Sequence, residues 1–136
     1  MILKIFTDGG SKGNPGPASI GMVFYLDKKL VFEHKESIGT ATNNDAEYTA
    51  LIKALENVKI QILNLKSTAQ VSKLEFYSDS RLMVNQVKGM FKVKNGKIKE
   101  YILKIRVLEQ EIKLPITYHL VPREQNAEAD RLVNEV

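Results

Sequence analysis

Four carboxylates stand where a purely structural role accounts for them poorly. Asp8 follows the apolar run ILKIF, and Asp79 follows the run LEFYS. Glu47 shares a helical face with apolar residues three, four and seven positions later, and Asp130 lies at the edge of an apolar stripe near the end of the chain. If two strand ends and the first turns of two helices meet at one edge of a sheet, these four side chains converge.

Each carboxylate also has a structural interpretation. Asp8, which precedes two glycines, could form an Asx turn. Glu47 lies three residues after Asn44 and could close a capping box. Asp79 could cap a helix, and Asp130 could interact with the positive first turn of its own helix. These alternatives stay open for each residue alone, but they weaken when the four are considered together.

Converging carboxylates have a defined chemistry. They repel one another, and some keep their protons unless a cation compensates the charge. Oxygen ligands without histidine or cysteine suit Mg²⁺ or Mn²⁺. Such a cluster can hold two metal ions about 3.5–4 Å apart, an arrangement that hydrolyses phosphodiesters by activating water and stabilising the leaving oxygen. We therefore expect Mg²⁺ or Mn²⁺ as cofactor, with two ions per site when substrate is bound.

The hydrophobic pattern predicts the elements that would position these residues. Alternating apolar runs predict strands, and 3.6-residue periodicity predicts helices. Strands are expected at 2–8, 18–27, 29–39, 73–79 and 115–122, and helices at 42–63, 80–91, 97–113 and 124–136. Asn43 or Asn44 is expected to cap the first helix, and Asp79 or Ser80 to start the second. The order predicts an α/β fold, a mixed five-stranded sheet with helices on both faces, in one domain over 1–136.

Composition narrows the class of protein. The chain has 136 residues, 43% of them apolar and 26% charged, which are ordinary globular values. It contains no apolar run of about 18 residues, so we expect no membrane-spanning helix. The absence of cysteine excludes disulfides and thiolate metal sites and fits a cytoplasmic protein. The first residues read as a strand rather than a signal peptide.

Positive charge is concentrated in one segment. Net charge is +4, and residues 88–106 hold seven lysines and arginines against one acid, Glu100. This pattern is typical of a solvated helix face, and it is also typical of a surface that binds a phosphate backbone. The sequence alone leaves both interpretations open.

Four segments carry a resemblance to a known family. FTDGGSKGNPGPASIG, TNNDAEYTAL, YSDSRLMVNQV and NAEADRL resemble, in order, the motifs of type 1 ribonuclease H (RNase HI), and the likeness covers almost the whole chain. The pattern looks most like the short forms found in archaea and some bacteria. The resemblance implies a ribonuclease H-like fold and a metal-dependent endonuclease. It would cut the RNA strand of RNA–DNA hybrids by a two-metal mechanism and leave 5′-phosphate and 3′-hydroxyl ends.

The resemblance also implies roles for individual residues. Its catalytic, metal-binding carboxylates fall on Asp8, Glu47, Asp79 and Asp130. The glycine-rich segment would lie close to RNA riboses, Asn43 and Asn44 would reach the minor groove, and Thr42 would contact a DNA phosphate. The substrate-binding set implied by the family is Gly9, Gly10, Ser11, Gly13, Asn14, Thr42, Asn43, Asn44 and Arg81. Hydroxyls on one strand only distinguish a hybrid from either pure duplex.

The chain departs from the family pattern in three places. Many relatives have a histidine in the loop before the last aspartate, where this chain has VPREQN. Arg123 stands nearest that place and Asn126 one helical turn before Asp130, so both are auxiliary candidates. Arginine cannot shuttle protons at neutral pH, although it can hold a phosphate.

His119 is expected to be structural and His34 to lie on the surface. The basic handle of bacterial members looks reduced and has no tryptophan, and six residues follow Asp130, fewer than usual.

Other functions remain to be weighed against this one. A catalytically weak nucleic-acid-binding module could keep the same fold, but the presence of all four carboxylates argues against it. A junction resolvase or transposase core would not be expected to keep the GNPGP and TNN elements. The expected partner is an RNA–DNA hybrid, with double-stranded RNA left open, and the expected state is a monomer with no membrane association.

Overall fold

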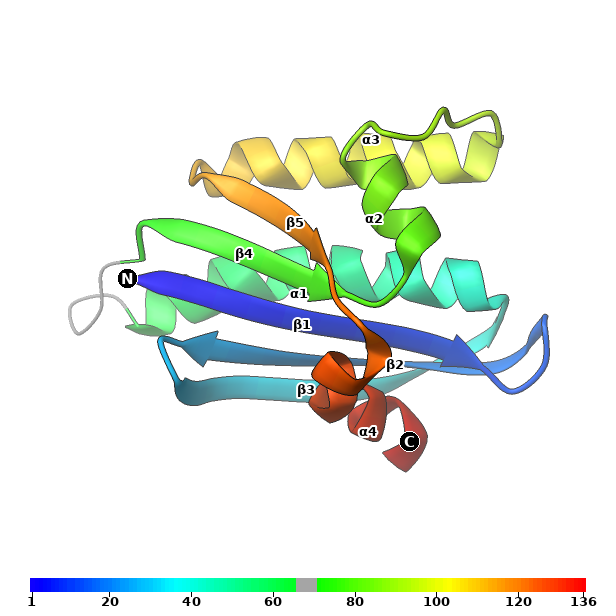
Figure 1. The fold of residues 1–136 in the computed structure, drawn as a ribbon, viewed down its shortest axis with the longest axis horizontal. Helices are drawn as coiled ribbons and strands as arrows, with labels where there is room; N and C mark the ends of the chain where they lie inside the picture. Colours follow the sequence, from blue (N-terminus) through cyan, green and yellow to red (C-terminus); the bar gives the residue numbers. More distant parts are fainter. Residues whose placement is uncertain (66–70) are drawn as a thin grey trace.

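Five strands form a mixed sheet in the order β3-β2-β1-β4-β5 (Figure 1). A computed structural model describes residues 1–65 and 71–136. Strands β1 (Ile2–Ser11), β2 (Gly16–Leu26) and β3 (Lys29–Ala41) form an antiparallel meander. Strand β4 (Lys73–Ser78) runs parallel to β1, and β5 (Ile116–Leu120) runs parallel to β4. The mixed five-stranded sheet predicted from the sequence is confirmed.

Helices cover both faces of this sheet, as predicted. They are α1 (Asn43–Leu65), α2 (Arg81–Val87), α3 (Gly96–Ile112) and α4 (Ala127–Glu135), and a 3₁₀ turn η2 (Arg123–Asn126) precedes α4. A Cβ atom at Gly9 would lie 2.3 Å from the Ala46 carbonyl oxygen of α1, and one at Gly21 would lie 2.6 Å from the Ala129 oxygen of α4. Gly21 pairs with Asp8, the neighbour of Gly9, and neighbouring strand residues point to opposite faces. Therefore α1 and α4 lie on opposite sides of the sheet (Figure 1).

The main core lies between α1 and the sheet. Alternate residues of β1, β2 and β4 point into it, and the apolar stripe predicted for the first helix packs against them. The buried residues on the two sides include Leu3, Ile5, Ile20, Met22, Phe24 and Leu74 from the strands, and Ala46, Ala50, Leu51, Ala54, Leu55 and Val58 from α1. Burial of this stripe fixes which face of α1 meets the sheet.

The N-terminus of α1 is capped one residue earlier than predicted. The Thr42 hydroxyl oxygen accepts a hydrogen bond from the Asp45 backbone N–H at 3.0 Å, so Thr42 is the capping residue. The prediction of Asn43 or Asn44 as the cap was wrong, because the Asn43 side chain is engaged elsewhere. Its oxygen accepts from the Ser11 backbone N–H at 2.8 Å, across 32 residues of sequence.

Two further helix boundaries differ from the predictions by more than two residues. Helix α2 starts after Ser80, whose hydroxyl accepts from the Met83 N–H at 3.3 Å, but it ends at Val87 rather than at 91. Gly89 adopts φ +77° just beyond, a left-handed conformation that stops the helix. At the C-terminus, residues 124–126 belong to the 3₁₀ turn rather than to α4. There Asn126 turns its side chain inward, and its amide nitrogen donates to the Thr7 carbonyl at 2.9 Å.

Strand β1 extends through the glycines that were expected to follow it. Gly9, Gly10 and Ser11 all pair with β2, so Asp8 lies inside the strand and the Asx-turn alternative for it is excluded. The reversal of the chain comes later, where the Lys12 N–H donates to the Pro17 carbonyl at 2.8 Å. The site described below is therefore built on regular strand backbone.

Candidate active site

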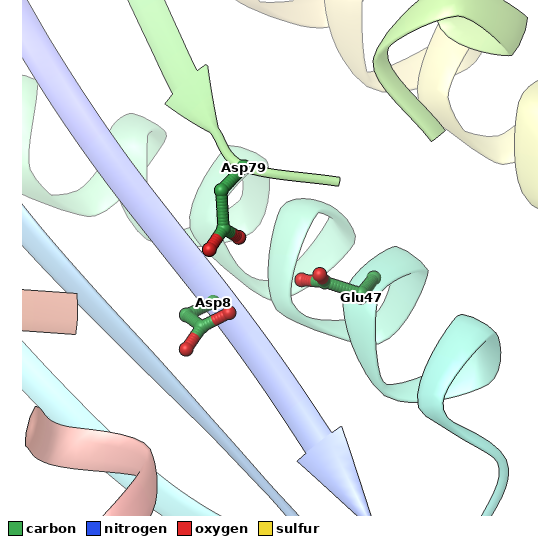
Figure 2. Close-up of side chains that lie close together, drawn as sticks. All are labelled: Asp8, Glu47 and Asp79. Atoms are coloured by element: carbon green, nitrogen blue, oxygen red, sulfur yellow. The ribbon is translucent and has the colours of Figure 1, made fainter. Parts of the chain in front are cut away.

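Three carboxyl groups meet where β1 continues past the end of β4. Pairing between these strands stops at Phe6 and Tyr77, so the edge of β1 is open beside Asp8. Asp79 follows β4 into this space, and Glu47 enters it from the first turns of α1. Figure 2 shows the three carboxyl groups pointing toward one another. One oxygen from each of Asp8, Glu47 and Asp79 lies within 4.8 Å of the others.

Glycine backbone holds Glu47 in this position. The Gly9 N–H, which has no strand partner on the open edge, donates to Glu47 Oε1 at 3.0 Å. The approach of α1 is close because Gly9 has no side chain; its Cβ would overlap the Ala46 carbonyl. Glu47 therefore does not close the capping box with Asn44 that was the structural alternative for it.

Asp130, the fourth predicted carboxylate, reaches the cluster from α4 on the side of Asp8. It lies outside the tight set of three, and its Oδ1 is 3.5 Å from Arg123 Nη2. After burial and the charge of Asp79, the nearby Asp130 carboxyl nevertheless also raises the pKa of Asp8. The structure thus brings all four predicted carboxylates to one edge of the sheet.

The electrostatics of the cluster favour a bound cation. Burial raises the pKa of Asp8 to about 8, with further contributions from the charge of Asp79 and from Asp130, against a small opposing effect of the Gly9 N–H. Burial, followed by the charges of Asp8 and Asp79, also raises the pKa of Glu47 well above its usual value. A divalent cation would relieve both effects, and carboxylate oxygens are the donors that Mg²⁺ and Mn²⁺ prefer. The residues present therefore fit such an ion.

The predicted substrate-binding residues surround the carboxylates unevenly. A cleft of about 880 Å³ opens at this edge of the sheet. Of the predicted site residues, its lining includes Asp8, Gly9, Gly10, Ser11, Asn43, Glu47, Asp79, Arg81, Arg123 and Asp130. Thr42, Asn44, Gly13 and Asn14 lie outside that lining, with Gly13 at the turn in a left-handed conformation of φ +119°.

Two asparagines tie the glycine-rich turn to α1. Asn43 accepts from the Ser11 N–H at 2.8 Å, and the Asn43 N–H donates to Asn14 Oδ1 at 2.9 Å. Because a backbone N–H must meet an oxygen, both amide oxygens are used and both NH₂ groups are directed elsewhere. Each side chain can therefore still donate to a ligand.

The two auxiliary candidates occupy different environments. Arg123 is at the cleft, with 77% of its side chain exposed and its guanidinium close to Asp130. Asn126 is buried, with 1% exposure, and does not line the cleft. By bonding the carbonyl of Thr7 it holds the strand beside Asp8, which is a structural contact.

Sequence reasoning missed several residues of the cleft wall. They are Lys12, Pro17, Ser19, Leu120, Val121, Pro122, Val133 and Asn134. The Ser19 hydroxyl donates to the Val133 carbonyl at 2.8 Å and so docks α4 on β2. Only the strand register, which pairs Ser19 with Gly10, could have placed Ser19 here.

The basic segment and the histidines can now be located. Lys97 pairs with Asp45 at 3.1 Å and Arg106 with Glu109 at 3.0 Å, so two of the seven basic side chains serve the fold. The His119 ring stacks on Tyr77 with centroids 4.9 Å apart, in line with the structural role expected for it. The His34 side chain is 40% exposed.

Fold and site together define an α/β protein with an acidic cleft at the edge of a mixed sheet, whose carboxylates fit a divalent cation. A family model described as RNase H matches residues 2–136. The chain belongs to the RNase H family, which confirms the family resemblance seen in the sequence.

Individual relatives agree with this membership. The bifunctional protein of Mycobacterium tuberculosis is 37% identical over 137 residues, covering 99% of this chain and 35% of the relative. Ribonuclease HI of Halobacterium salinarum is 36% identical over 131 residues, covering 96% of this chain and 61% of the relative. The chain thus spans about a third to three fifths of the length of these curated relatives.

A solved structure extends the comparison. LC11-RNase H1 in complex with an RNA/DNA hybrid superimposes with a TM-score of 0.89 at 41% identity, covering 98% of this chain and 95% of that one. In the described part of this chain, no helix combines the length and hydropathy needed to cross a bilayer.

Proposed function

We propose that this chain is a ribonuclease H that hydrolyses the RNA strand of RNA–DNA hybrids. The observation that carries the proposal is the convergence of Asp8, Glu47 and Asp79 within 4.8 Å in an open cleft of an RNase H family member. The likeness to a relative solved with an RNA/DNA hybrid supports the substrate. The products would carry 5′-phosphate and 3′-hydroxyl ends.

The carboxylates would hold the metal. Asp8, Glu47, Asp79 and Asp130 would bind Mg²⁺ or Mn²⁺, with two ions when substrate is present. Bound metal would supply activation of water and stabilisation of the leaving oxygen. The chain's own contribution is to hold these oxygens together in a partly buried site, where the Gly9 N–H fixes Glu47.

Hybrid recognition would rest on donors beside the cluster. The free NH₂ groups of Asn43 and Asn14 suit the acceptors of a minor groove and of ribose 2′-hydroxyls. Arg81 and Arg123 line the same cleft and suit phosphate oxygens. Thr42 and Asn44 remain proposed substrate contacts that would require the hybrid to extend beyond the cleft.

Further parts of the proposal follow from the family resemblance. We propose that residues 1–136 act as one catalytic domain, in a monomer and in the cytoplasm. Double-stranded RNA also presents 2′-hydroxyls, so the cleavage assay includes an RNA duplex.

A gel cleavage assay tests the proposal. One labelled RNA strand is annealed to DNA or RNA or left single, alongside a DNA duplex, in Mg²⁺, Mn²⁺ or chelator. We expect metal-dependent cutting of the hybrid's RNA, 5′-phosphate products, loss of cutting in Asp8→Asn and Asp79→Asn, and retention in the surface control Glu100→Gln. Tight hybrid binding without cutting would instead favour a binding module of the same fold. Retained cutting in either aspartate variant would remove that residue from the catalytic set.

A further inference from the structure

A hydrogen bond behind the carboxylates joins the helix that carries Glu47 to the helix that follows Asp79. The Tyr48 hydroxyl donates to Gln86 Oε1 at 2.6 Å, across 38 residues of sequence. Tyr48 is the residue after Glu47 in α1. Gln86 lies near the end of α2, whose capping residue directly follows Asp79. The bond therefore connects two of the elements that present the carboxylates.

Tyr48 is held rigidly in place. Its side chain is 0% exposed, and burial raises the pKa of Tyr48 to about 12, so the hydroxyl keeps its proton. Its ring stacks on Tyr101 of α3 with centroids 5.1 Å apart and planes 12° apart. The Tyr101 hydroxyl in turn donates to Asp45 Oδ1 at 3.0 Å, and Lys97 pairs with the other oxygen of Asp45. Three helices thus meet around one tyrosine.

Helix α2 depends on such contacts for its position. It has seven residues, and helices this short have little stability of their own. Its apolar side, Met83, Val84 and Val87, is buried, but apolar packing constrains sliding and rotation less sharply than a short, directional hydrogen bond does. On the other side of the cluster, Glu47 is fixed by the Gly9 N–H. Asp79 lies between β4 and α2, and the bond from Tyr48 to Gln86 ties the far end of α2 to α1.

We propose that Tyr48 is a positioning residue, whose hydroxyl bond to α2 sets the separation of Glu47 and Asp79 and thereby the affinity of the cluster for a divalent cation. The inference rests on the proposed function in taking these carboxylates as metal ligands. Tyr48 is buried and lies outside the cleft. Packing of its ring in the core does not by itself require the hydroxyl, so the proposed role belongs to the hydroxyl.

Tyr48→Phe tests the role because it removes the hydroxyl and keeps the ring. Mn²⁺ binding to the chain without substrate is measured by electron paramagnetic resonance of the free ion. We expect the Mn²⁺ dissociation constant to rise about three- to tenfold. The Mg²⁺ concentration for half-maximal cleavage should rise in parallel, while KM for the hybrid at saturating Mg²⁺ stays within about twofold.

Three further variants separate positioning from general destabilisation. Gln86→Met removes the bond from its other end and should raise the Mn²⁺ dissociation constant similarly, and the double variant should add little to either change. Tyr118→Phe is the matched control. It removes a bond of the same length, 2.6 Å, from Tyr118 to Glu109 at the α3–β5 contact. It should lower the thermal midpoint and leave Mn²⁺ affinity unchanged.

The outcomes distinguish this inference from the function on which it rests. If Tyr48→Phe lowers the thermal midpoint as the control does and leaves Mn²⁺ affinity within about twofold of wild type, the positioning role is wrong and the proposed metal site stands. If the wild-type chain binds no Mn²⁺, the metal site itself is wrong and the inference falls with it.

Discussion

Replacing Asp8 with asparagine should stabilise the metal-free protein at neutral pH, although it removes a proposed catalytic group. In the folded chain, burial and the neighbouring carboxylates raise the pKa of Asp8 from 3.8 to about 8. Because its pKa is higher in the folded than in the unfolded chain, protonated Asp8 adds to the free energy of unfolding. This contribution is complete below pH 4 and is lost progressively as the pH rises through 8.

The size of the effect follows from this difference. At pH 7 the solution is about 3 pH units above the ordinary pKa of Asp8, and each unit is worth about 1.4 kcal/mol. The wild-type protein therefore loses at most about 4 kcal/mol of unfolding free energy between low pH and pH 7. Glu47 lies in the same buried cluster and its pKa is raised by burial and by the charge of Asp8, so neutralising Asp8 also changes the protonation of Glu47 and reduces the net effect. We expect a gain of about 2 kcal/mol for Asp8→Asn at pH 7, or about 6 °C in the thermal midpoint.

Thermal unfolding followed by circular dichroism at pH 4, 5.5, 7 and 8.5, in the presence of chelator, measures this gain. The difference between Asp8→Asn and wild type should be small at pH 4 and should grow up to about pH 8. Saturating Mg²⁺ should reduce it, because the ion stabilises the wild-type cluster by binding the folded state. Glu100→Gln, on the exposed side of α3, should show no such trend.

A lower midpoint for Asp8→Asn at pH 7 in chelator would refute the electrostatic reasoning. So would a gain of the same size at every pH, since that would point to packing rather than to charge. Either result would mean that the buried carboxylates are neutralised or solvated in another way when no metal is bound.

Three other changes should have distinct effects. Gly9→Ala should destabilise the fold by at least about 3 kcal/mol in urea unfolding, because its Cβ would overlap the Ala46 carbonyl; Gly10→Ala, with its nearest neighbour 3.5 Å away, should change stability little. Arg123→Ala should slow hybrid cleavage about tenfold, as expected for one charged phosphate contact, and a loss as complete as that in Asp8→Asn would show a catalytic role. Replacing Lys92 and Lys94 with alanine should make the fall of log affinity for the hybrid with log salt shallower, by about 1–2 in the slope. Cleavage at saturating substrate should not change. An unchanged slope would identify the basic segment as a solvated face.

The carboxylate cluster could be predicted from the sequence because its geometry follows from strand order. Asp8 and Asp79 lie at the ends of apolar runs, and two neighbouring parallel strands bring such ends to the same edge. Glu47 could be predicted to face the sheet from helical periodicity alone. These inferences required only the repeat of apolar residues within each element and the direction of each strand in the sheet.

Two of the errors arise where a side chain bonds to a residue far away in sequence. Asparagine is a strong capping residue, so the sequence predicts Asn43 or Asn44 as the cap of α1. The Asn43 oxygen instead serves Ser11 in another element, which left Thr42 to cap the helix. Likewise, the sequence predicts too early a start for the last helix, because no local sequence pattern indicates that Asn126 turns inward toward Thr7. No local pattern predicts the bond between Tyr48 and Gln86 either.

Gly9 shows how one position can serve both the fold and the site. The family resemblance implies that the glycine-rich segment after Asp8 lies close to RNA riboses. In the structure the group closest to Gly9 is α1 itself. The same missing side chain that admits the helix brings Glu47 within reach of the Gly9 N–H, one residue from Asp8. Packing of α1 against the sheet and assembly of the carboxylate cluster thus depend on the same contact at Gly9. A substitution that moves this helix should therefore weaken both stability and metal binding.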